Sequence, residues 1–288
     1  MTVAVTGASG HLGRFAIRSL LDRGVPASDI VAGARSPEKV ADLAALGVQV
    51  READYDNPST LAEAFKGVDR LLLVSSSEVG ARVPQHTNAV EAAVAAGVSF
   101  IAYTSAPYAD TTDLPVAPDH KATEEVIRAS GVPFSFLRNS WYVENYTDNL
   151  ATTLQHGAVI GSAGEGKVSA APRADFAAAA AAVIAGEGHD NTVYELGGDD
   201  AFTLAELAAE VARQTGKEIV YRDLPPAEYA QVLVGAGLPD GYAQVLAGCD
   251  VSVREGKLFT GTGDLSRLIG RPTTPLSTSV AEGLARLS

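Results

Sequence analysis

Three glycines near the start of the chain have the spacing of a phosphate-binding turn. Residues 6–13 follow a short apolar stretch and open a segment with helical spacing. Gly7 permits a tight turn, Gly10 lets the backbone approach a pyrophosphate, and Gly13 allows the helix to pack closely on the strand. We predict a dinucleotide site whose phosphates face the N–H groups at the helix start, with a turn that binds no ligand as the alternative. The predicted contact residues are Gly7, Ala8, Ser9, Gly10, His11, Leu12 and Gly13.

The residues at the end of the second candidate strand indicate which nicotinamide cofactor is bound. A carboxylate there would accept a hydrogen bond from the ribose 2′-hydroxyl of NAD, whereas an arginine would pair with the 2′-phosphate of NADP. The chain has Gly33-Ala34-Arg35 at this place, and a planar guanidinium suits a phosphate. We therefore predict NADP(H) as the cofactor, preferred over NAD(H). A surface arginine without a ligand is the alternative.

Polar residues follow the third and fourth candidate strands, and the carboxyl ends of parallel strands border a ligand crevice. Asp54 could accept a hydrogen bond from the adenine amino group, or could close a local turn with its own backbone. Ser75, Ser76 and Ser77 could contact the cofactor ribose, and could also cap the next helix. Both alternatives stay open for each group.

A run of aromatic and amide residues follows the sixth candidate strand. Residues 137–146 hold the only tryptophan, Trp141, together with Asn139, Tyr142 and Tyr146. An aromatic face can stack on a planar ring, and an asparagine can orient a carboxamide. We predict that these four side chains shape a ligand pocket, because polar and aromatic groups converge there. A buried aromatic anchor for the C-terminal part is the alternative.

The chain lacks the residues that several common chemistries need. None of its nine tyrosines has a lysine four residues later, so the tyrosine–lysine pair of most short-chain reductases is absent and we assign no catalytic residue. His120 and Lys121 open the helix expected at that place, and either touch ribose or substrate or lie exposed. No G-x-S-x-G elbow, Walker A motif or metal-binding histidine pair occurs, so no metal site is expected. Cys249, the only cysteine, is expected to be buried and unreactive.

Short apolar segments alternate with helical ones over the first half of the chain. Continuous apolar runs predict strands that are buried on both faces. Their alternation with helices predicts an α/β fold of the Rossmann type, a doubly wound parallel sheet with helices on both faces. The candidate strands are Val3–Thr6, Ile30–Ala34, Val48–Glu52, Leu71–Val74, Phe100–Thr104 and Phe134–Leu137. The candidate helices are Leu12–Leu21, Pro37–Leu46 and Gln85–Ala96.

The pattern is less regular after about residue 138. The alanine-rich residues 177–182 predict a helix, and Tyr194–Leu196 predicts a short strand. Thr203 and Glu206 have the spacing of a capping box at the start of another helix. The pentapeptide Tyr-Ala-Gln-Val-Leu occurs twice between residues 229 and 246, which we interpret as two helices around a turn.

We predict two regions in the chain. Residues 1–138 form an NADP-binding Rossmann domain, to which segments around residues 155–200 return. Residues 139–288 form a smaller mixed region that binds the substrate and covers the site as a lid. No linker rich in proline and serine separates the two, so we expect them to pack together.

Composition narrows the classes of function. The chain has 288 residues, 46% of them hydrophobic and 20% charged, which is ordinary for a globular protein. The net charge of −13 argues against a nucleic-acid partner. A single cysteine excludes an internal disulfide and suits a reducing compartment. We see no targeting or membrane-spanning segment, so we expect a soluble cytoplasmic protein without a membrane partner; a homo-oligomer is compatible with the sequence.

Taken together, these motifs resemble the NmrA-like atypical short-chain dehydrogenase/reductase family, and within it the bacterial quinone reductases. The resemblance runs nearly end to end, and its most specific strings are residues 75–80 and 138–146. Other shared segments are Arg35–Pro37, Ala53–Tyr55, Pro84–His86, Phe100–Ser105, Arg173–Asp175, Val193–Leu196 and Gly237–Gly241. It implies NADPH bound at the glycine turn, Arg35 and the serines, and a quinone pocket between the two regions. The further cofactor contacts it implies are Asn139, Ser140, Trp141, Tyr142, Val143, Glu144 and Ala170.

The resemblance implies an NAD(P)H:quinone oxidoreductase that transfers a hydride directly from NADPH to a quinone. A quinone accepts hydride readily and can take protons from water, so holding the two rings together suffices and no tyrosine–lysine pair is needed. Two alternatives share the same cofactor site. One is a redox sensor that binds NADP without catalysis and acts through a protein partner, and the other is an NADPH reductase of another electrophile.

Overall fold

A seven-stranded parallel sheet forms the centre of the molecule. The structure is a computed structural model that describes residues 1–78 and 80–287. The strand order β3-β2-β1-β4-β5-β6-β8 starts in the middle of the sheet and extends outwards in both directions, which confirms the predicted doubly wound fold. The strands are β1 (Val3–Val5), β2 (Ile30–Ala34), β3 (Gln49–Glu52), β4 (Arg70–Leu73), β5 (Phe100–Ser105), β6 (Phe134–Asn139) and β8 (Thr192–Leu196).

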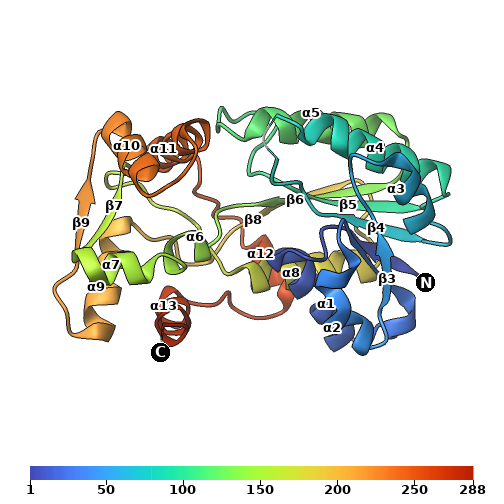
Figure 1. Cartoon of the computed structure of the whole chain (residues 1–288), viewed down its shortest axis with the longest axis horizontal. Coiled ribbons are helices and arrows are strands. Elements are labelled where there is room, and N and C mark those ends of the chain that lie inside the picture. Colours follow the sequence, from blue (N-terminus) through green and yellow to red (C-terminus); the bar gives the residue numbers. More distant parts are fainter. Residues whose placement is uncertain (79, 288) are drawn as a thin grey trace.

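Helices cover both faces of this sheet, as Figure 1 shows. One face carries α1, α8 and α12, and the other carries α3, α4 and α5. These helices are α1 (His11–Asp22), α3 (Pro58–Ala64), α4 (Arg82–Ala95), α5 (Ala117–Ala129), α8 (Arg173–Ala185) and α12 (Asp264–Ile269). The two layers explain why the strands read as unbroken apolar runs. On β4, Leu72 packs towards α1 and α8, while Leu71 and Leu73 pack towards α3, α4 and α5.

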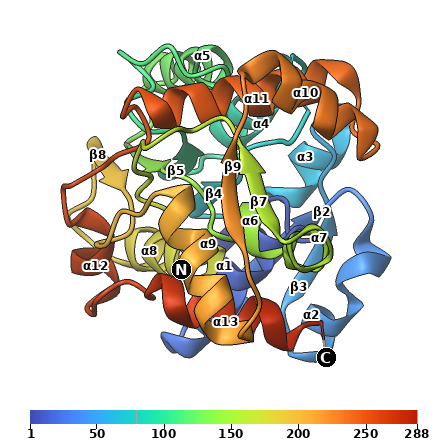
Figure 2. The same ribbon diagram turned by 90° about the vertical axis from the view of Figure 1, so that its left-hand side faces the viewer.

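The remaining elements form a second, smaller group beside the sheet. Its two parallel strands are β7 (Ala158–Gly161) and β9 (Val220–Asp223), and in Figure 2 they face the viewer with α10 and α11 above them. The helices here are α6 (Glu144–Thr147), α7 (Leu150–His156), α9 (Leu204–Thr215), α10 (Pro226–Gly235), α11 (Asp240–Arg254) and α13 (Leu276–Ala285). α8 packs on the large sheet and β8 is one of its strands. β7 instead pairs with β9 in the small sheet. The boundary at residue 138 remains a prediction.

Most of the sequence-based elements are confirmed, with two differences. Residues 37–46 form a 3₁₀ turn (Pro37–Val40) and the short helix α2 (Ala41–Ala45) rather than one helix, because only Val40 and Leu43 reach the core. β3 is an edge strand and is only partly buried. The predicted capping box is present, since Thr203 and Glu206 each bond the other's backbone. The two pentapeptides lie on α10 and α11, as predicted, and no described helix is long and apolar enough to cross a bilayer.

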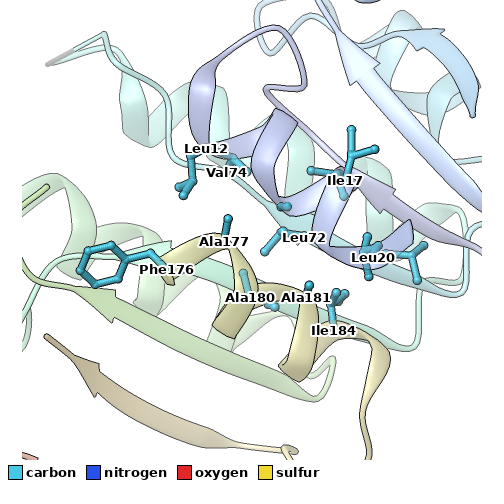
Figure 3. Packing of buried hydrophobic residues seen from close by; sticks show 14 of the residues in the cluster. Leu12, Ile17, Leu20, Leu72, Val74, Phe176, Ala177, Ala180, Ala181 and Ile184 are labelled. Carbon is cyan, nitrogen blue, oxygen red and sulfur yellow. The ribbon is translucent and has the colours of Figure 1, made fainter. Parts of the chain in front are cut away.

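α1 and α8 pack directly against each other (Figure 3). Leu12 and Leu20 of α1 face an alanine surface on α8 that includes Ala177, Ala180 and Ala181, and Ile17 belongs to the same buried cluster. Small side chains let two helices approach closely, so this alanine run serves packing as well as helix propensity. The contact fixes α1, and with it the turn that precedes α1.

The turn before α1 depends on glycine at two positions. Gly7 has a φ of +61°, in the left-handed region that other residues rarely adopt. A Cβ on Gly13 would lie 2.5 Å from the carbonyl oxygen of Gly7 and 2.8 Å from its carbonyl carbon. Because both atoms are backbone, they cannot move away as a flexible side chain would. The first helical turn of α1 therefore lies directly against the backbone of the glycine turn that precedes it.

A buried ion cluster joins the strands on the other side of the sheet. The guanidinium of Arg138, at the end of β6, bonds Glu124 of α5 at 2.7 and 2.9 Å, Glu195 of β8 at 2.9 Å and Asp110 at 2.7 Å. Although burial opposes the charge of Arg138, these carboxylates raise its pKa. Ser105, at the end of β5, donates to Glu124 at 2.7 Å. The cluster therefore fixes the ends of three strands.

We expect the substitution Gly13→Ala to lower the free energy of unfolding by about 1–3 kcal/mol, because the added methyl group overlaps backbone atoms. Urea unfolding measures the change. Gly241→Ala is the matched control, since Gly241 lies in the first turn of α11 and a Cβ there meets nothing within 4 Å. The control should be neutral or slightly stabilising. Equal stability of the two variants would contradict the close approach at Gly13.

Candidate active site

One cavity of about 540 Å³ opens at the carboxyl ends of the central strands. Its walls come from the glycine turn, from the segments that follow β2, β3, β4, β5 and β6, and from α11. The carboxyl ends of parallel strands share one edge of a sheet, so residues far apart in sequence meet here. The predicted residues that border it are Gly7, Ser9, Gly10, His11, Leu12, Gly13, Arg35, Asp54, Ser75, Ser76, Ser77, Asn139, Ser140, Trp141 and Tyr142.

Four predicted cofactor residues lie outside this lining. Ala8, Val143 and Ala170 are buried and do not border the cavity. The carboxylate of Glu144 accepts hydrogen bonds from the backbone N–H of Arg173 at 2.9 and 3.1 Å. Arg173 is the first residue of α8, so Glu144 compensates the free N–H at that helix start. Contact of these four with a cofactor remains a prediction.

Arg35 borders the cavity from the end of β2, and its side chain is 66% exposed. Nη1 of Arg35 donates to Oε1 of Glu78 at 3.0 Å, and Gln85 donates to the other carboxylate oxygen at 3.0 Å. An ion pair this open to water contributes little to stability. The guanidinium can therefore exchange this partner for a phosphate at small cost.

Both interpretations of Asp54 fit the structure, while one interpretation of the serines does not. Asp54 borders the cavity, and its Oδ1 also accepts the backbone N–H of Asp56 at 3.1 Å, which is the local turn bond. The three serines do not cap the following helix. α4 begins at Arg82, its N-cap residue is Ala81, and no side chain caps it. Several residues separate Ser77 from α4, so the serines are too far from its first N–H groups.

Two buried histidines lie near the cavity, and hydrogen bonding determines the tautomer of one of them, His86. The backbone N–H of Ser76 donates to Nε2 of His86 at 3.0 Å. Nδ1 of His86 therefore carries the proton, and it lies 2.9 Å from the hydroxyl of Thr123. His120 borders the cavity, and its Nδ1 lies 2.8 Å from the hydroxyl of Tyr103. An exposed position for His120 is thus wrong, because α5 turns it inwards, whereas Lys121 is exposed.

Both histidines are neutral at physiological pH. Burial, and after it the positive charge of Arg82, lower the pKa of His86 to about 4. The same two causes lower the pKa of His120 to about 3. A proton on Nε2 of His86 would also face the N–H of Ser76, so the hydrogen bond itself favours the neutral ring. His120 therefore faces the cavity as a neutral imidazole.

The aromatic segment after β6 divides between the cavity and the core. Asn139, Trp141 and Tyr142 border the cavity. Tyr146 does not, because it lies on α6 and its ring packs edge-on against Phe202. For Tyr146 the structure supports the alternative of an aromatic anchor. Burial raises the pKa of Tyr142, so its phenol stays protonated.

The sequence analysis missed one wall of the cavity, which belongs to α11. The residues are Tyr242, Val245, Leu246 and Cys249. Their spacing of three and four places them on one face of the helix. The C-terminal half of α11 is fixed to the small sheet, where Asp250 accepts the N–H of Ser162 at 2.7 Å and Arg254 pairs with Asp223 at 2.9 Å. Cys249 is buried as predicted, and burial raises the pKa of its thiol to about 12.

The residues present fit a nicotinamide dinucleotide. The glycine turn has the close approach between helix and turn that leaves backbone N–H groups facing the cavity. At the other end, Oδ1 of Asn139 is buried and has no hydrogen-bond partner in the described part of the chain. A buried acceptor without a donor is costly, and a carboxamide N–H would satisfy it. Within residues 1–78 and 80–287 no group of three metal-ligand side chains converges.

The comparison with known proteins decides the family. The sequence profile of the NmrA-like family matches residues 1–282. This chain belongs to the NmrA-like family. It is 52% identical to Quinone oxidoreductase 2 of Escherichia coli (strain K12) over 279 residues, which cover 97% of each chain.

Solved structures agree with this assignment. A crystal structure of an Escherichia coli NADPH-dependent quinone oxidoreductase complexed with NADPH has a TM-score of 0.94 and 51% identity, covering 98% of this NmrA-like chain and 99% of that chain. The Citrobacter sp. triphenylmethane reductase complexed with NADP(H) has a TM-score of 0.93 and 38% identity, covering 98% and 100%. The predicted family resemblance is confirmed.

We expect the free energy of unfolding at acidic pH to depend on His86. An unfolded histidine binds a proton near pH 6.5, whereas the folded His86 does so only near pH 4, so unfolding takes up a proton between these values. The free energy of unfolding should therefore decrease as the pH falls, by about 1.4 kcal/mol per pH unit for each such histidine. Asp250, whose raised pKa is about 6, acts in the opposite direction between pH 3.8 and 6.

The comparison of variants isolates the histidine from the other groups. Urea unfolding over a pH series should give a shallower slope for His86→Gln than for the wild type. His156→Gln, at an exposed histidine, is the control and should keep the wild-type slope. A wild-type slope for His86→Gln would mean that the ring is not held neutral.

Proposed function

We propose that this chain is an NADPH-dependent quinone reductase. One observation carries the proposal, namely 52% identity to Quinone oxidoreductase 2 of E. coli across 97% of both chains. Identity at this level over nearly the whole length extends through both regions that border the cavity. The cavity supports the proposal, because it offers a phosphate-binding turn at one end and aromatic and apolar side chains at the other.

In the cofactor half of the cavity, each part of the cofactor would contact the segment that follows a different strand. The glycine turn would hold the pyrophosphate with backbone N–H groups and the positive end of α1. Arg35 would pair with the 2′-phosphate, and Asp54 would face the adenine. Ser75, Ser76 and Ser77 border the cavity and would contact the ribose, and the Oδ1 of Asn139 would accept a hydrogen bond from the carboxamide. Bound NADPH would supply the hydride.

The acceptor half is built to hold a flat ring. Trp141 and Tyr142 border it from the segment after β6, and Tyr242, Val245 and Leu246 border it from α11. Aromatic and aliphatic surfaces exclude water and favour a planar, weakly polar ligand such as a quinone. Holding two rings at reacting distance is the main requirement, because orientation alone lowers the barrier substantially. Protons can then come from water.

The proposal extends to setting and partners. A small-molecule quinone is the partner, and the acidic net charge makes a nucleic-acid partner unsuitable. The reducing cytoplasm suits a chain whose only cysteine is buried and unpaired. We keep the prediction of residues 1–138 as the cofactor domain and 139–288 as the substrate-binding region.

We expect protein-dependent consumption of NADPH when 1,4-benzoquinone is added. Absorbance at the NADPH band gives the rate, and controls without protein are needed because small quinones oxidise NADPH unaided. NADH should be consumed more slowly at the same concentration. Tight NADPH binding without turnover would contradict the enzyme and favour the redox sensor. Turnover only with other electrophiles would favour the second alternative.

We expect Asn139→Ala and Tyr142→Phe to reduce quinone turnover by about 10- to 100-fold, because each helps to place a ring. Tyr146→Phe is the matched control. Its hydroxyl is buried and has no partner within residues 1–78 and 80–287, and its ring lies outside the cavity, so turnover should be retained. If Asn139→Ala and Tyr142→Phe both leave turnover intact, the site assignment is wrong.

We expect Arg35→Gln to weaken NADPH binding by about 10- to 100-fold, which corresponds to one charge-assisted hydrogen bond. NADH lacks the 2′-phosphate, so its affinity should not change. Binding titrations with both cofactors give the ratio. Comparable affinities of the wild type for NADH and NADPH would contradict the cofactor preference.

A further inference from the structure

Arg82 is a buried cation that has no carboxylate partner in the described part of the chain. It is the first residue of α4, it is 9% exposed, and it borders the cavity. Its Nε donates to the carbonyl oxygen of Ser76 at 2.6 Å, while Nη1 is buried and has no hydrogen-bond partner among the described residues. Across residues 1–78 and 80–287 it forms no ion pair with a carboxylate.

A buried charge without a counter-charge destabilises a folded protein. The contrast with Arg138 is instructive, because three carboxylates surround that guanidinium. A cation held in this state indicates a site that receives its negative charge from a ligand.

The location of Arg82 separates it from the predicted phosphate sites. Those sites lie at the glycine turn and at Arg35, after β1 and β2. Arg82 follows β4, and its charge acts on His120 of α5 and on Tyr142 after β6. Burial raises the pKa of Tyr142, and the charge of Arg82 opposes this rise. Arg82 therefore borders the cavity beside Ser76, after β4, and the neutral His120 cannot compensate its charge.

We propose that Arg82 binds the oxygen atom of the acceptor that becomes negatively charged when the acceptor is reduced. The proposal rests on the proposed quinone reductase function. It makes Arg82 a catalytic residue, with its free Nη1–H directed at that oxygen.

A cation at this place would accelerate hydride transfer beyond what ring placement alone achieves. A quinone that accepts a hydride takes both electrons of the broken C4–H bond of the dihydronicotinamide and becomes a hydroquinone monoanion. The nicotinamide ring is oxidised in the same step, and a proton from water then completes the hydroquinone. Negative charge on the quinone oxygen exists only after the hydride moves, so a fixed cation stabilises the transition state more than the ground state.

A role for Arg82 in binding the nicotinamide ribose fits less well. Ribose hydroxyls could accept its free N–H, but they are neutral and would leave the buried charge uncompensated. The two roles differ in what they recognise. A ribose ligand affects cofactor affinity, whereas an oxyanion ligand affects the rate and the ionisation of a bound phenol.

The test uses 4-nitrophenol, whose absorption distinguishes the phenol from the phenolate and which resembles a reduced quinone. Protein saturated with NADP⁺ is titrated with the probe over a pH series. We expect the wild type to lower the pKa of the bound probe by about one to three units. Arg82→Gln should abolish this shift, and Arg82→Lys should keep part of it because the charge remains. Lys121→Gln removes a nearby exposed charge and should keep the whole shift.

Turnover gives the second measurement. We expect Arg82→Gln to lower kcat with benzoquinone by about 100-fold, while the affinity for NADPH stays at the wild-type value. A wild type that does not bind the probe, or a shift that survives in Arg82→Gln, would overturn the proposal. So would a loss confined to NADPH affinity, which would identify a ribose ligand.

The two proposals can fail separately. An Arg82-dependent shift in a protein without quinone turnover would keep the anion site and reject the quinone reductase. Quinone turnover without any shift would keep the enzyme and reject the role of Arg82. Melting temperatures of the Arg82 variants show whether they fold, and removal of an unpaired buried charge should not lower them.

Discussion

The site depends on the close approach between the first turn of α1 and the backbone of Gly7. No side chain fits at residue 13, so the helix can lie against the turn and present its N–H groups to the cavity. The alanine surface of α8 holds α1 from the other side. α8 in turn begins at Arg173, whose backbone N–H is bound by Glu144 from the segment after β6. Packing therefore couples the phosphate end of the cavity to the aromatic segment at the other end.

Polar groups inside the molecule divide into two kinds. Arg138, Glu124 and Glu195 satisfy one another and fix the ends of β5, β6 and β8. His86 is likewise satisfied on both ring nitrogens. Nη1 of Arg82 and Oδ1 of Asn139 have no partner in the part of the chain that the structure describes, and both residues border the cavity. Satisfied groups hold the framework, while two of the unsatisfied groups lie where a ligand would complete them.

The elements that could be predicted from sequence are those whose pattern has one physical cause. Strands buried on both faces appear as apolar runs, and the Thr203–Glu206 box marks a helix start because two backbone groups need partners there. The glycine turn was recognisable because each glycine has a steric reason.

The errors at the site concern where side chains point rather than which helices and strands form. Tyr142 and Tyr146 occur in one short motif, but the backbone at Tyr142 is extended beside Ala171, whereas Tyr146 lies on α6, so the two rings point apart. The spacing of the cavity-lining residues on α11 places them on one face of a helix, but it does not show which part of the molecule this face contacts. An arginine at a helix start is typical of a surface, and only the packing of α4 shows that Arg82 is buried.

The wall formed by Tyr242, Val245, Leu246 and Cys249 belongs to a helix whose C-terminal half is fixed to the small sheet by Asp250 and Arg254. The cofactor side of the cavity is built from the large sheet. The two sides can therefore diverge independently in evolution. Substitutions along one face of α11 would change which acceptors enter, while the dinucleotide site and the reaction it supports stay the same. A few substitutions at the cavity-facing positions of this one helix would thus let relatives of this fold accept new substrates.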